Sequence, residues 1–302
     1  MRVLVTGATG FVGGRIAARL RERGDQVVAS VRSPSPRLQA LGVEQIEVGL
    51  DLTAEDLAGI DAVVHAAASA GPAMDDARAV NRDGTRRLCE AALAAGVDRL
   101  VHISTTSVYD LDAVGDAVVD EDAPLATEHS GDSPAGSAGN PYSLTKAEAE
   151  AEVIEATARG LSTAILRPPA VLGAGPTSTW GTRVPRRLLE GNAPARHPET
   201  TYGFVHVEDL VDATLAALDS DVRTTVNVVG GHTTVGNYQR AVADLLPAAV
   251  ELPAPHPTDS PWLGSYATDR LADHLGVRPA RTFDEAMAEI AESWRDEAPE
   301  ES

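Results

Sequence analysis

Residues 3–20 read VLVTGATGFVGGRIAARL, an apolar run that ends in a glycine-rich turn and continues into an amphipathic segment. Gly7, Gly10 and Gly13 fall where such a turn needs small residues: for a tight reversal, for close approach of backbone to a ligand, and for close packing of a helix on a sheet. A helix that opens at this turn points its free N–H groups at whatever the turn holds, which suits a pyrophosphate. The strand–turn–helix context favours a dinucleotide-binding turn over one that is only structural.

Outward from this turn, short β-branched runs alternate with alanine-rich segments of helical period as far as about residue 167. The alternation predicts an α/β fold with a Rossmann-type, doubly wound parallel sheet covered by helices on both faces. Beyond residue 168 the pattern becomes irregular, so we expect a smaller C-terminal substrate-binding α/β domain. The expected dinucleotide-binding domain is 1–167, with return segments near 204–229, and the substrate-binding domain is mainly 168–302. The expected helices span about 11–23, 78–95, 144–159, 268–275 and 283–295, and the expected strands include VLVTG, QVVASV, VEQIEVG, DAVVHAA, RLVHIST and STAILR.

The segment 110–139, DLDAVGDAVVDEDAPLATEHSGDSPAGSAG, is acidic and rich in Gly, Ser and Pro. This composition predicts a long surface loop. A loop of this length inside a compact domain is either a functional lid or a segment without fixed structure.

The chain of 302 residues carries 45 acidic and 25 basic side chains, a formal net charge of −20. Such a charge repels phosphate backbones and anionic lipids, which argues against nucleic acid and membrane partners. No run approaches the length of an apolar membrane span, and the N-terminus enters a strand directly, so we expect a cytoplasmic protein. The preference for arginine over lysine, with so many carboxylates, resembles proteins of salt-rich (halophilic) cytoplasm. The single cysteine, Cys89, has no internal disulfide partner and is expected to be buried and inert.

The stretch NPYSLTK, residues 140–146, holds the only lysine of the chain, four positions after Tyr142. On a helix this spacing places the phenol of Tyr142 and the ammonium of Lys146 on one face, one turn apart. A phenol with an ordinary pKa of about 10 is a poor base at neutral pH, and a nearby positive charge lowers that pKa. The pair predicts an acid/base centre, although the spacing is common and a solvated helix face is the alternative.

The second expected strand reads VVASVRSPSPR and ends where the adenosine ribose of a dinucleotide would lie. An acid at the end of this strand would hydrogen-bond both ribose hydroxyls of NAD, but Val31 stands there, followed by Arg32 and Ser33. A guanidinium beside a hydroxyl suits a 2′-phosphate. We therefore favour NADP(H) over NAD(H), with a merely solvated Arg32 as the alternative.

Several motifs in order resemble the extended short-chain dehydrogenase/reductase superfamily of NAD(P)-dependent epimerases, dehydratases and reductases. The glycine turn and the Tyr142–Lys146 pair are joined over almost the whole chain by LDLT, VVHAAA, AVNRDGTRRL, HISTTSVYD, ILRPPAVLG, FVHVEDLVDA and DRLADHLGVRPARTFDEAM. The resemblance implies that Tyr142 exchanges a proton with a substrate hydroxyl or carbonyl. It also implies that Lys146 binds the nicotinamide ribose and lowers the pKa of Tyr142, and that Thr105 hydrogen-bonds the reacting oxygen. Thr105 as a simple strand-end hydroxyl is the alternative.

The same resemblance assigns a set of positions to the cofactor, with Asn81 equally suited to bracing backbone. The set comprises Gly7, Thr9, Gly10, Phe11, Val12, Gly13, Arg32, Ser33, Asp51, Leu52, Ala66, Ala67, Ala68, Asn81, Ser104, Tyr142, Lys146 and Pro169. The resemblance also implies a homodimer that pairs through helices near 78–95 and 142–159. His65, His102 and His206 sit in apolar, strand-like contexts and are expected to be packed or hydrogen-bonded core residues, and no metal-ligand spacing appears.

The substrate positions depart from those of sugar-nucleotide members of the superfamily. Ala170 and Tyr202 stand where an asparagine and an arginine usually serve the substrate phosphates, so the nucleotide-sugar prediction is weakened. Arg183, Arg186 and Arg187 are either replacement cations or a solvent face. We therefore expect a net oxidoreductase acting on a small-molecule hydroxyl or carbonyl carbon, with a nucleotide-sugar epimerase that holds NAD as the second prediction. An NADP-sensing regulator without chemistry is the non-enzymatic alternative.

Overall fold

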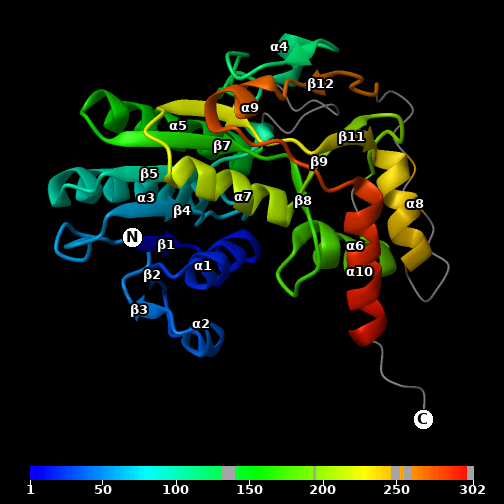
Figure 1. Ribbon diagram of the computed structural model, residues 1–302. Helices are drawn as coiled ribbons and strands as arrows, with labels where there is room; N and C mark the ends of the chain where they lie inside the picture. Colours follow the sequence, from blue (N-terminus) through cyan, green and yellow to red (C-terminus); the bar gives the residue numbers. More distant parts are fainter. Residues whose placement is uncertain (131–139, 193–194, 246–251, 253, 255–259, 298–302) are drawn as a thin grey trace.

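The computed structural model describes residues 1–130, 140–192, 195–245, 252, 254 and 260–297. Its main element is a seven-stranded parallel sheet in the order β10-β7-β5-β4-β1-β2-β3, shown in Figure 1. These strands are β1 (Arg2–Thr6), β2 (Gln26–Ser30), β3 (Glu44–Ile46), β4 (Ala62–His65), β5 (Arg99–Ile103), β7 (Ser162–Arg167) and β10 (Thr224–Asn227). The order reverses direction between β1 and β4, which is where an open α/β sheet forms a crevice at the carboxyl ends of its strands. The predicted α/β fold class is confirmed.

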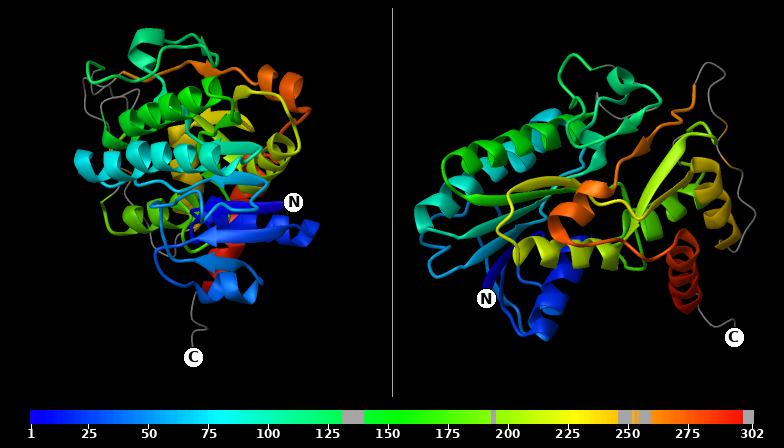
Figure 2. Two further views of the ribbon diagram at one scale, coloured as in Figure 1. Left: turned by 90° about the vertical axis from the view of Figure 1, so that its left-hand side faces the viewer. Right: turned by 45° about the horizontal axis from the view of Figure 1, so that its top comes forward.

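Helices cover both faces of this sheet. On one face, α1 (Phe11–Arg23) and α7 (Val207–Leu218) close a core that includes Val5, Ile16 and Leu210. On the other face, α3 (Met74–Ala95) and α5 (Pro141–Ala158) pack side by side over a core that includes Leu4, Leu88 and Val153 (Figures 1 and 2). The central strands β1, β4, β5 and β7 are buried on both sides, as expected for a parallel sheet, whereas the edge strand β3 is partly exposed. A short helix, α2 (Pro36–Ala40), lies between β2 and β3.

Local sequence accounts for the helix ends. Glycines in the left-handed conformation, Gly24 and Gly96, end α1 and α3, because an L side chain is strained there. Asn140 caps α5 by accepting a hydrogen bond from the Ser143 N–H at 2.9 Å, with Pro141 in the first turn. The helix predicted near 78–95 begins at Met74, and the one predicted from 144 begins at Pro141.

The C-terminal part contains a second, smaller sheet in the order β11-β9-β8. Its strands are β8 (Ala170–Leu172), β9 (Thr201–His206) and β11 (Gly231–Thr234), with β9 parallel to β8 and antiparallel to β11. A π-helical turn η2 (Thr179–Arg183), α6 (Val184–Leu189), α8 (Val235–Leu245) and α10 (Phe283–Glu297) surround it (Figure 1). The chain between the two sheets returns through α7 and β10 to the large sheet, and α9 (Asp269–Leu275) packs beside them. The division at about residue 168 into a dinucleotide-binding domain and a substrate-binding domain stays a prediction.

The segment after β5 is more ordered than its acidic composition indicated. It forms a 3-10 turn η1 (Thr106–Val108), the short helix α4 (Leu111–Val114) and the strand β6 (Val118–Val119), which pairs with β12 (Ser265–Tyr266). Tyr109, Val119 and Trp262 are buried together there. The prediction of one long surface loop is therefore wrong for residues 110–130. Trp262 packs on this segment, and its Nε1 donates to the carbonyl of Gly115, which is 147 positions earlier in the chain. Residues 131–139 lie outside the described part of the chain.

Candidate active site

The glycine turn lies at the carboxyl edge of the large sheet, between β1 and α1. Gly7 has a φ of +71°, and a Cβ on it would lie 2.6 Å from the backbone nitrogen of Ala67. A Cβ on Gly13 would collide with the Gly7 carbonyl. The first turn of α1 has no acidic residue and no side-chain cap, so its N–H groups remain for a ligand. The turn therefore fits the pyrophosphate of a dinucleotide: only glycine permits it, and the helix presents unoccupied donors.

Two guanidinium groups lie on the side where the adenosine would be. Val31 is buried after β2, whereas Arg32 and Ser33 are exposed. The second group belongs to Arg37, whose Nη2 lies 3.5 Å from where a Cβ on Gly14 would be, at the start of α1. Sequence reasoning missed Arg37, because only the fold brings α2 against the first turn of α1.

The remaining positions near the adenosine differ in burial. Asp51 is exposed and pairs with Arg87 at 3.3 Å, while Leu52 is buried. Arg32 and Asp51 are thus both at the surface, and Leu52 belongs to the core under α3.

Behind the turn, polar side chains form a buried row along the ends of the strands. Thr6 pairs with His65 across β1 and β4, with Oγ1 2.7 Å from Nδ1, and it accepts from the Ala67 N–H at 3.2 Å. Nε2 of His65 lies 2.8 Å from Oγ1 of Thr85. This row holds the Ala66–Ala68 segment, in which Ala66 and Ala67 are partly buried and Ala68 is exposed.

Asn81 is fully buried on α3 and uses its amide on the protein itself. It accepts from the Ser69 N–H at 2.7 Å and donates to the Ser69 carbonyl at 2.9 Å and to Thr145 Oγ1 at 2.8 Å. This is the bracing arrangement that the sequence left open: the amide ties the loop after β4 to α3 and α5.

Tyr142 and Thr105 come together at the carboxyl edge of β5. Tyr142 lies in the first turn of α5, and Thr105 follows β5 as the N-cap of η1. Burial of its hydroxyl raises the pKa of Tyr142, and a hydrogen bond with Thr105 opposes that rise. The Thr105 hydroxyl also accepts from the Ser107 N–H at 3.1 Å, which fixes its position.

Lys146 lies one turn further along α5 and is buried to 1% exposure. Its Nζ donates to the Ile103 carbonyl at 2.7 Å and lies 3.0 Å from Nε2 of His102, both on β5. Burial lowers the pKa of Lys146 to about 8, against the opposing charge of Glu150. Burial is the largest influence on the pKa of Tyr142 and raises it, while the ammonium of Lys146 is turned onto β5; the predicted lowering of this pKa by Lys146 stays a prediction.

Ser104 and Pro169 lie on the two neighbouring strand ends. The Ser104 hydroxyl donates to Glu150 at 2.5 Å and so points into the protein, away from solvent. Pro169, after β7, packs against the backbone of Gly203 on β9. Sequence reasoning did not foresee the partner of Ser104, since Glu150 is 46 residues away.

Aromatic side chains occupy the region between the two sheets. Tyr266 hydrogen-bonds Thr106, the neighbour of Thr105, and its ring lies 3.1 Å from where a Cβ on Gly203 would be. Tyr202 stacks on Tyr238 with ring centroids 4.8 Å apart, and its buried hydroxyl has no hydrogen-bond partner among the described residues. Burial raises the pKa of both Tyr202 and Tyr266, and the positive charge of Arg196 opposes part of that rise. An aromatic cluster thus stands at the Tyr202 position.

The other substrate-side residues are Ala170 and three arginines. Ala170 is buried in β8. Arg183, Arg186 and Arg187 are exposed on η2 and α6, and Arg187 donates to the Asn192 carbonyl at 3.0 Å. Their exposure matches the solvent-face alternative.

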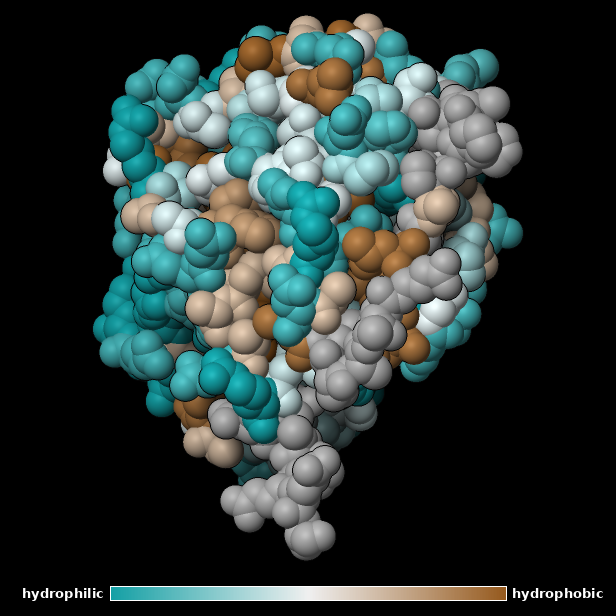
Figure 3. Space-filling model, turned by 90° about the vertical axis from the view of Figure 1, so that its right-hand side faces the viewer, coloured by the Kyte–Doolittle hydropathy of each residue, from teal (hydrophilic) through white to brown (hydrophobic). Residues whose placement is uncertain are grey.

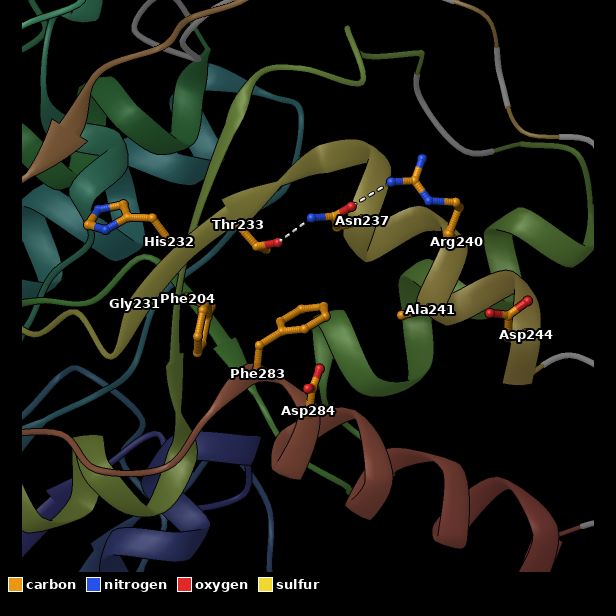
Figure 4. A pocket seen from close by; sticks show the side chains of 10 residues that line it. All are labelled: Phe204, Gly231, His232, Thr233, Asn237, Arg240, Ala241, Asp244, Phe283 and Asp284. Atoms are coloured by element: carbon orange, nitrogen blue, oxygen red, sulfur yellow. Dashed lines mark hydrogen bonds between the residues drawn. The ribbon is translucent and has the colours of Figure 1, made fainter.

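A separate surface pocket of ≈ 520 Å³ lies in the C-terminal part, between β9, β11, α8 and α10. Phe204 and Phe283 line it with their rings edge to face, and the guanidinium of Arg240 donates to Asn237 at 2.5 Å (Figure 4). Figure 3 shows the side of the molecule that carries α8 and α10, where hydrophobic patches lie among hydrophilic side chains. None of the predicted catalytic or cofactor residues lines this pocket, so it is distinct from the site at the sheet edge.

The structure also bears on metal ions and membranes. Among the described residues, no three or more His, Cys, Asp or Glu side chains gather in a way that could hold a metal ion. In the same residues, no helix combines the length and apolar character needed to span a membrane. His65, His102 and His206 are buried and hydrogen-bonded, as predicted, with His206 Nε2 2.8 Å from Glu289.

Comparison with known proteins places this geometry in context. A 2-alkyl-3-oxoalkanoate reductase from Stenotrophomonas maltophilia is 36% identical over 185 residues, 58% of this chain and 52% of that protein. A 3-diazoavenalumate denitrifying reductase from a Streptomyces species is 30% identical over 309 residues, 97% of this chain and 88% of that protein. The solved structure of MoeE5 in complex with UDP-glucose and NAD superposes with a TM-score of 0.81 at 27% identity, covering 98% of this chain and 99% of that one.

The NAD dependent epimerase/dehydratase family matches residues 3–230, which contain the glycine turn, the large sheet and the Tyr142–Lys146 pair. The family match and the sheet order agree with the resemblance seen in the sequence. The chain therefore belongs to the NAD-dependent epimerase/dehydratase family of the extended short-chain dehydrogenase/reductase superfamily and is an NAD(P)-dependent oxidoreductase of that type.

Proposed function

We propose that this chain is an NADP(H)-preferring reductase that acts on a carbonyl carbon of a small molecule, with Tyr142 as the proton donor. The observation that carries the proposal is the meeting of Tyr142 and Thr105 at the end of β5, beside the buried ammonium of Lys146. When bound, the nicotinamide cofactor supplies the hydride. The residues of the chain then have to orient the substrate oxygen and deliver the proton.

Tyr142 suits the acid role in this chemistry. Because burial raises its pKa, the phenol holds its proton at neutral pH and can donate it to the oxygen of a carbonyl that becomes an alkoxide. The Thr105 hydroxyl accepts from the Ser107 N–H and donates to Ser107 Oγ at 3.2 Å; turned to the substrate, its proton makes it a second donor for the same oxygen. Two donors at one oxygen stabilise the negative charge that develops on it in the transition state.

Lys146 and the glycine turn hold the cofactor in this proposal. Two of the three ammonium N–H groups face β5, which leaves one for a ribose hydroxyl. The turn from Gly7 to Gly13 receives the pyrophosphate, and Arg32 and Arg37 supply positive charge for a 2′-phosphate. The cofactor positions predicted from the sequence are kept in this proposal with two changes: Asn81 and the Ser104 side chain act as braces, and Arg37 is added.

The substrate is proposed to be a small carbonyl compound that lacks a diphosphate. Tyr202 and Ala170 offer no charged group that could pair with diphosphate oxygens. The Tyr266 hydroxyl hydrogen-bonds Thr106, next to the proposed catalytic Thr105. The second candidate, an epimerase that retains NAD, is supported by the full-length likeness to the MoeE5 structure, which contains UDP-glucose and NAD. An NADP-sensing protein without chemistry is the third.

Replacing Tyr142 with Phe tests the proposal. We expect loss of NADPH-dependent turnover of an aldehyde and ketone panel by at least a hundredfold, with NADPH binding within threefold of wild type, because only the phenol oxygen is removed. Unchanged turnover would refute the assignment of Tyr142. Exchange at a sugar-nucleotide carbon without net NADPH consumption would instead support the epimerase.

We also propose that two copies pair through α3 and α5. These helices pack together on one face of the sheet, and Ile154 on α5 is 54% exposed, the kind of apolar side chain that a dimer interface would cover. Light scattering after size exclusion should show a dimer that Ile154→Asp shifts toward monomer. A monomeric wild-type chain would contradict this.

A further inference from the structure

Two histidines lie side by side in the sheet directly behind the candidate active site. His65 on β4 is in register with His102 on β5, and their ring centroids are 5.0 Å apart. Both side chains have 0% exposure and face α3 and α5. Neutral imidazoles are expected here, because burial and the charge of Lys146 lower the pKa of both, that of His65 to about 3.

The hydrogen bonds of the two rings differ. Both nitrogens of His65 have partners, the hydroxyls of Thr6 and Thr85. For His102, Nε2 meets Lys146, whereas Nδ1 is buried without a partner among the described residues. An ammonium has no lone pair and can only donate, so Nε2 of His102 accepts and Nδ1 carries the proton. A buried N–H without a partner is unfavourable. The hydrogen bond from Lys146 to Nε2 is the contact that offsets this cost for the His102 ring.

Lys146 has little freedom as a result. Of its three N–H groups, one goes to His102 Nε2 at 3.0 Å and one to the Ile103 carbonyl at 2.7 Å. Both acceptors belong to β5, so the direction of the third N–H is set by the strand. A flexible side chain with four rotatable bonds thereby becomes a donor of fixed direction.

We propose that His102 is a positioning residue: its neutral imidazole holds Lys146 against β5 so that the remaining ammonium N–H faces the cofactor. The inference rests on the proposed role of Lys146 at the cofactor ribose. His102 lies on β5, outside the motif around Tyr142 and Lys146 on α5, and gains a role at the cofactor site through this contact.

Other ionisable groups surround this contact and act on it. Glu150, one turn beyond Lys146 on α5, raises the pKa of Lys146 and is itself paired with Arg167 of β7 at 2.5 Å. His65 faces from β4, and Tyr142 lies one turn before Lys146 on α5. Of these groups in the described part of the chain, His102 is the one whose side chain hydrogen-bonds Nζ directly.

The single lysine makes a direct experiment possible. Full-length protein produced with 13C-labelled lysine gives one side-chain Cε signal, that of Lys146, and its shift against pH reports the protonation of Nζ. The titration is run without cofactor and again with NADPH, beside NADPH dissociation constants measured by fluorescence. Wild type should titrate at about pH 8 without cofactor.

Three variants separate positioning from packing. His102→Leu removes the acceptor and should lower the midpoint of Lys146 by about one pH unit and weaken NADPH at least fivefold, since a buried ammonium loses a partner. His102→Gln places an amide oxygen near the Nε2 position and should restore both values. His65→Leu removes an equally buried ring that has no hydrogen bond to Lys146, and should leave its midpoint within about 0.3 units.

Equal midpoints and NADPH affinities in wild type and His102→Leu would overturn the proposal, as would an equal shift in His65→Leu. If His102→Leu does not fold, His102→Asn serves in its place, because its shorter amide ends near Nδ1 and cannot reach Nζ. The proposal then requires a higher Lys146 midpoint and a tighter NADPH affinity in His102→Gln than in His102→Asn. Equal values in the two variants would refute it. The cofactor-free titration does not depend on turnover, so it stands or falls separately from the Tyr142→Phe test.

Discussion

Replacing Arg167 with Leu should be among the most destabilising single changes in this chain. The Arg167 side chain is 4% exposed and Glu150 is 0% exposed. Nε and Nη2 of Arg167 donate to Glu150 at 2.9 Å and 2.5 Å, and Nη1 donates to the Tyr109 hydroxyl and the Glu121 carbonyl, both at 2.9 Å. The substitution removes all of these donors and leaves the Glu150 carboxylate buried with the Ser104 hydroxyl.

The size of the loss follows from the charge that remains. Breaking a buried ion pair by removing one partner costs about 3–5 kcal/mol, because the other charge is left uncompensated. For a chain of this size, at about 2 °C per kcal/mol, the melting temperature should fall by about 6–10 °C. Calorimetry and guanidinium unfolding measure both quantities.

Two controls separate the buried charge from other effects. Glu150→Leu combined with Arg167→Leu removes both charges and should recover at least half of the loss. Arg86→Leu breaks an exposed pair, in which Arg86 is 52% exposed and 3.8 Å from Asp83, and should change stability by less than about 1 kcal/mol. A loss below about 1 kcal/mol for Arg167→Leu, or no recovery in the double variant, would refute the reasoning.

Four further substitutions test the cofactor site and the buried lysine beside it. Gly7→Ala forces an L side chain to a φ of +71° and into backbone, so NADPH affinity should fall at least tenfold. The control Gly59→Ala, at φ +72° with open space around it, should lose only about 1–2 kcal/mol of stability to backbone strain and keep normal affinity. Equal stabilities by calorimetry and equal NADPH affinities in the two variants would contradict this. Arg32→Ala and Arg37→Ala should each weaken NADPH about tenfold to a hundredfold and NADH by less than threefold, since a charge-assisted contact contributes about 1.5–3 kcal/mol; matched losses for both cofactors would exclude contact with the 2′-phosphate. Lys146 has a folded pKa of about 8, below its ordinary 10.5, so the unfolded chain holds this proton more tightly and the native state is penalised below about pH 8. The free energy of unfolding of Lys146→Met minus that of wild type should therefore decrease by about 3 kcal/mol between pH 7 and pH 10.5, as measured by denaturant unfolding. A difference that does not change with pH would show that the ammonium is not desolvated.

The fold was predictable because its signals are local. The glycine turn, the β-branched runs and the caps at Gly24 and Gly96 each act over a few residues, and the order of strands and helices follows from them. The pairing of Tyr142 with Lys146 on one helix was local in the same way.

What the sequence could not show depends on long-range burial. Helix spacing places Tyr142 near Lys146, but it could not show that burial is the largest influence on the pKa of Tyr142 and raises it. His102 meets Lys146 across 44 positions, and Tyr109 donates to Asn227 across 118, so no window of sequence contains either contact. Trp262 covers Leu111 and Val119 in the same way, which turned an acidic segment into folded structure.

The burial of Lys146 leaves the folded protein without a lysine amine at its surface. A reagent that acylates lysine amines would thus reach Lys146 only in molecules that have opened, so its uptake would report unfolding of α5 from the sheet.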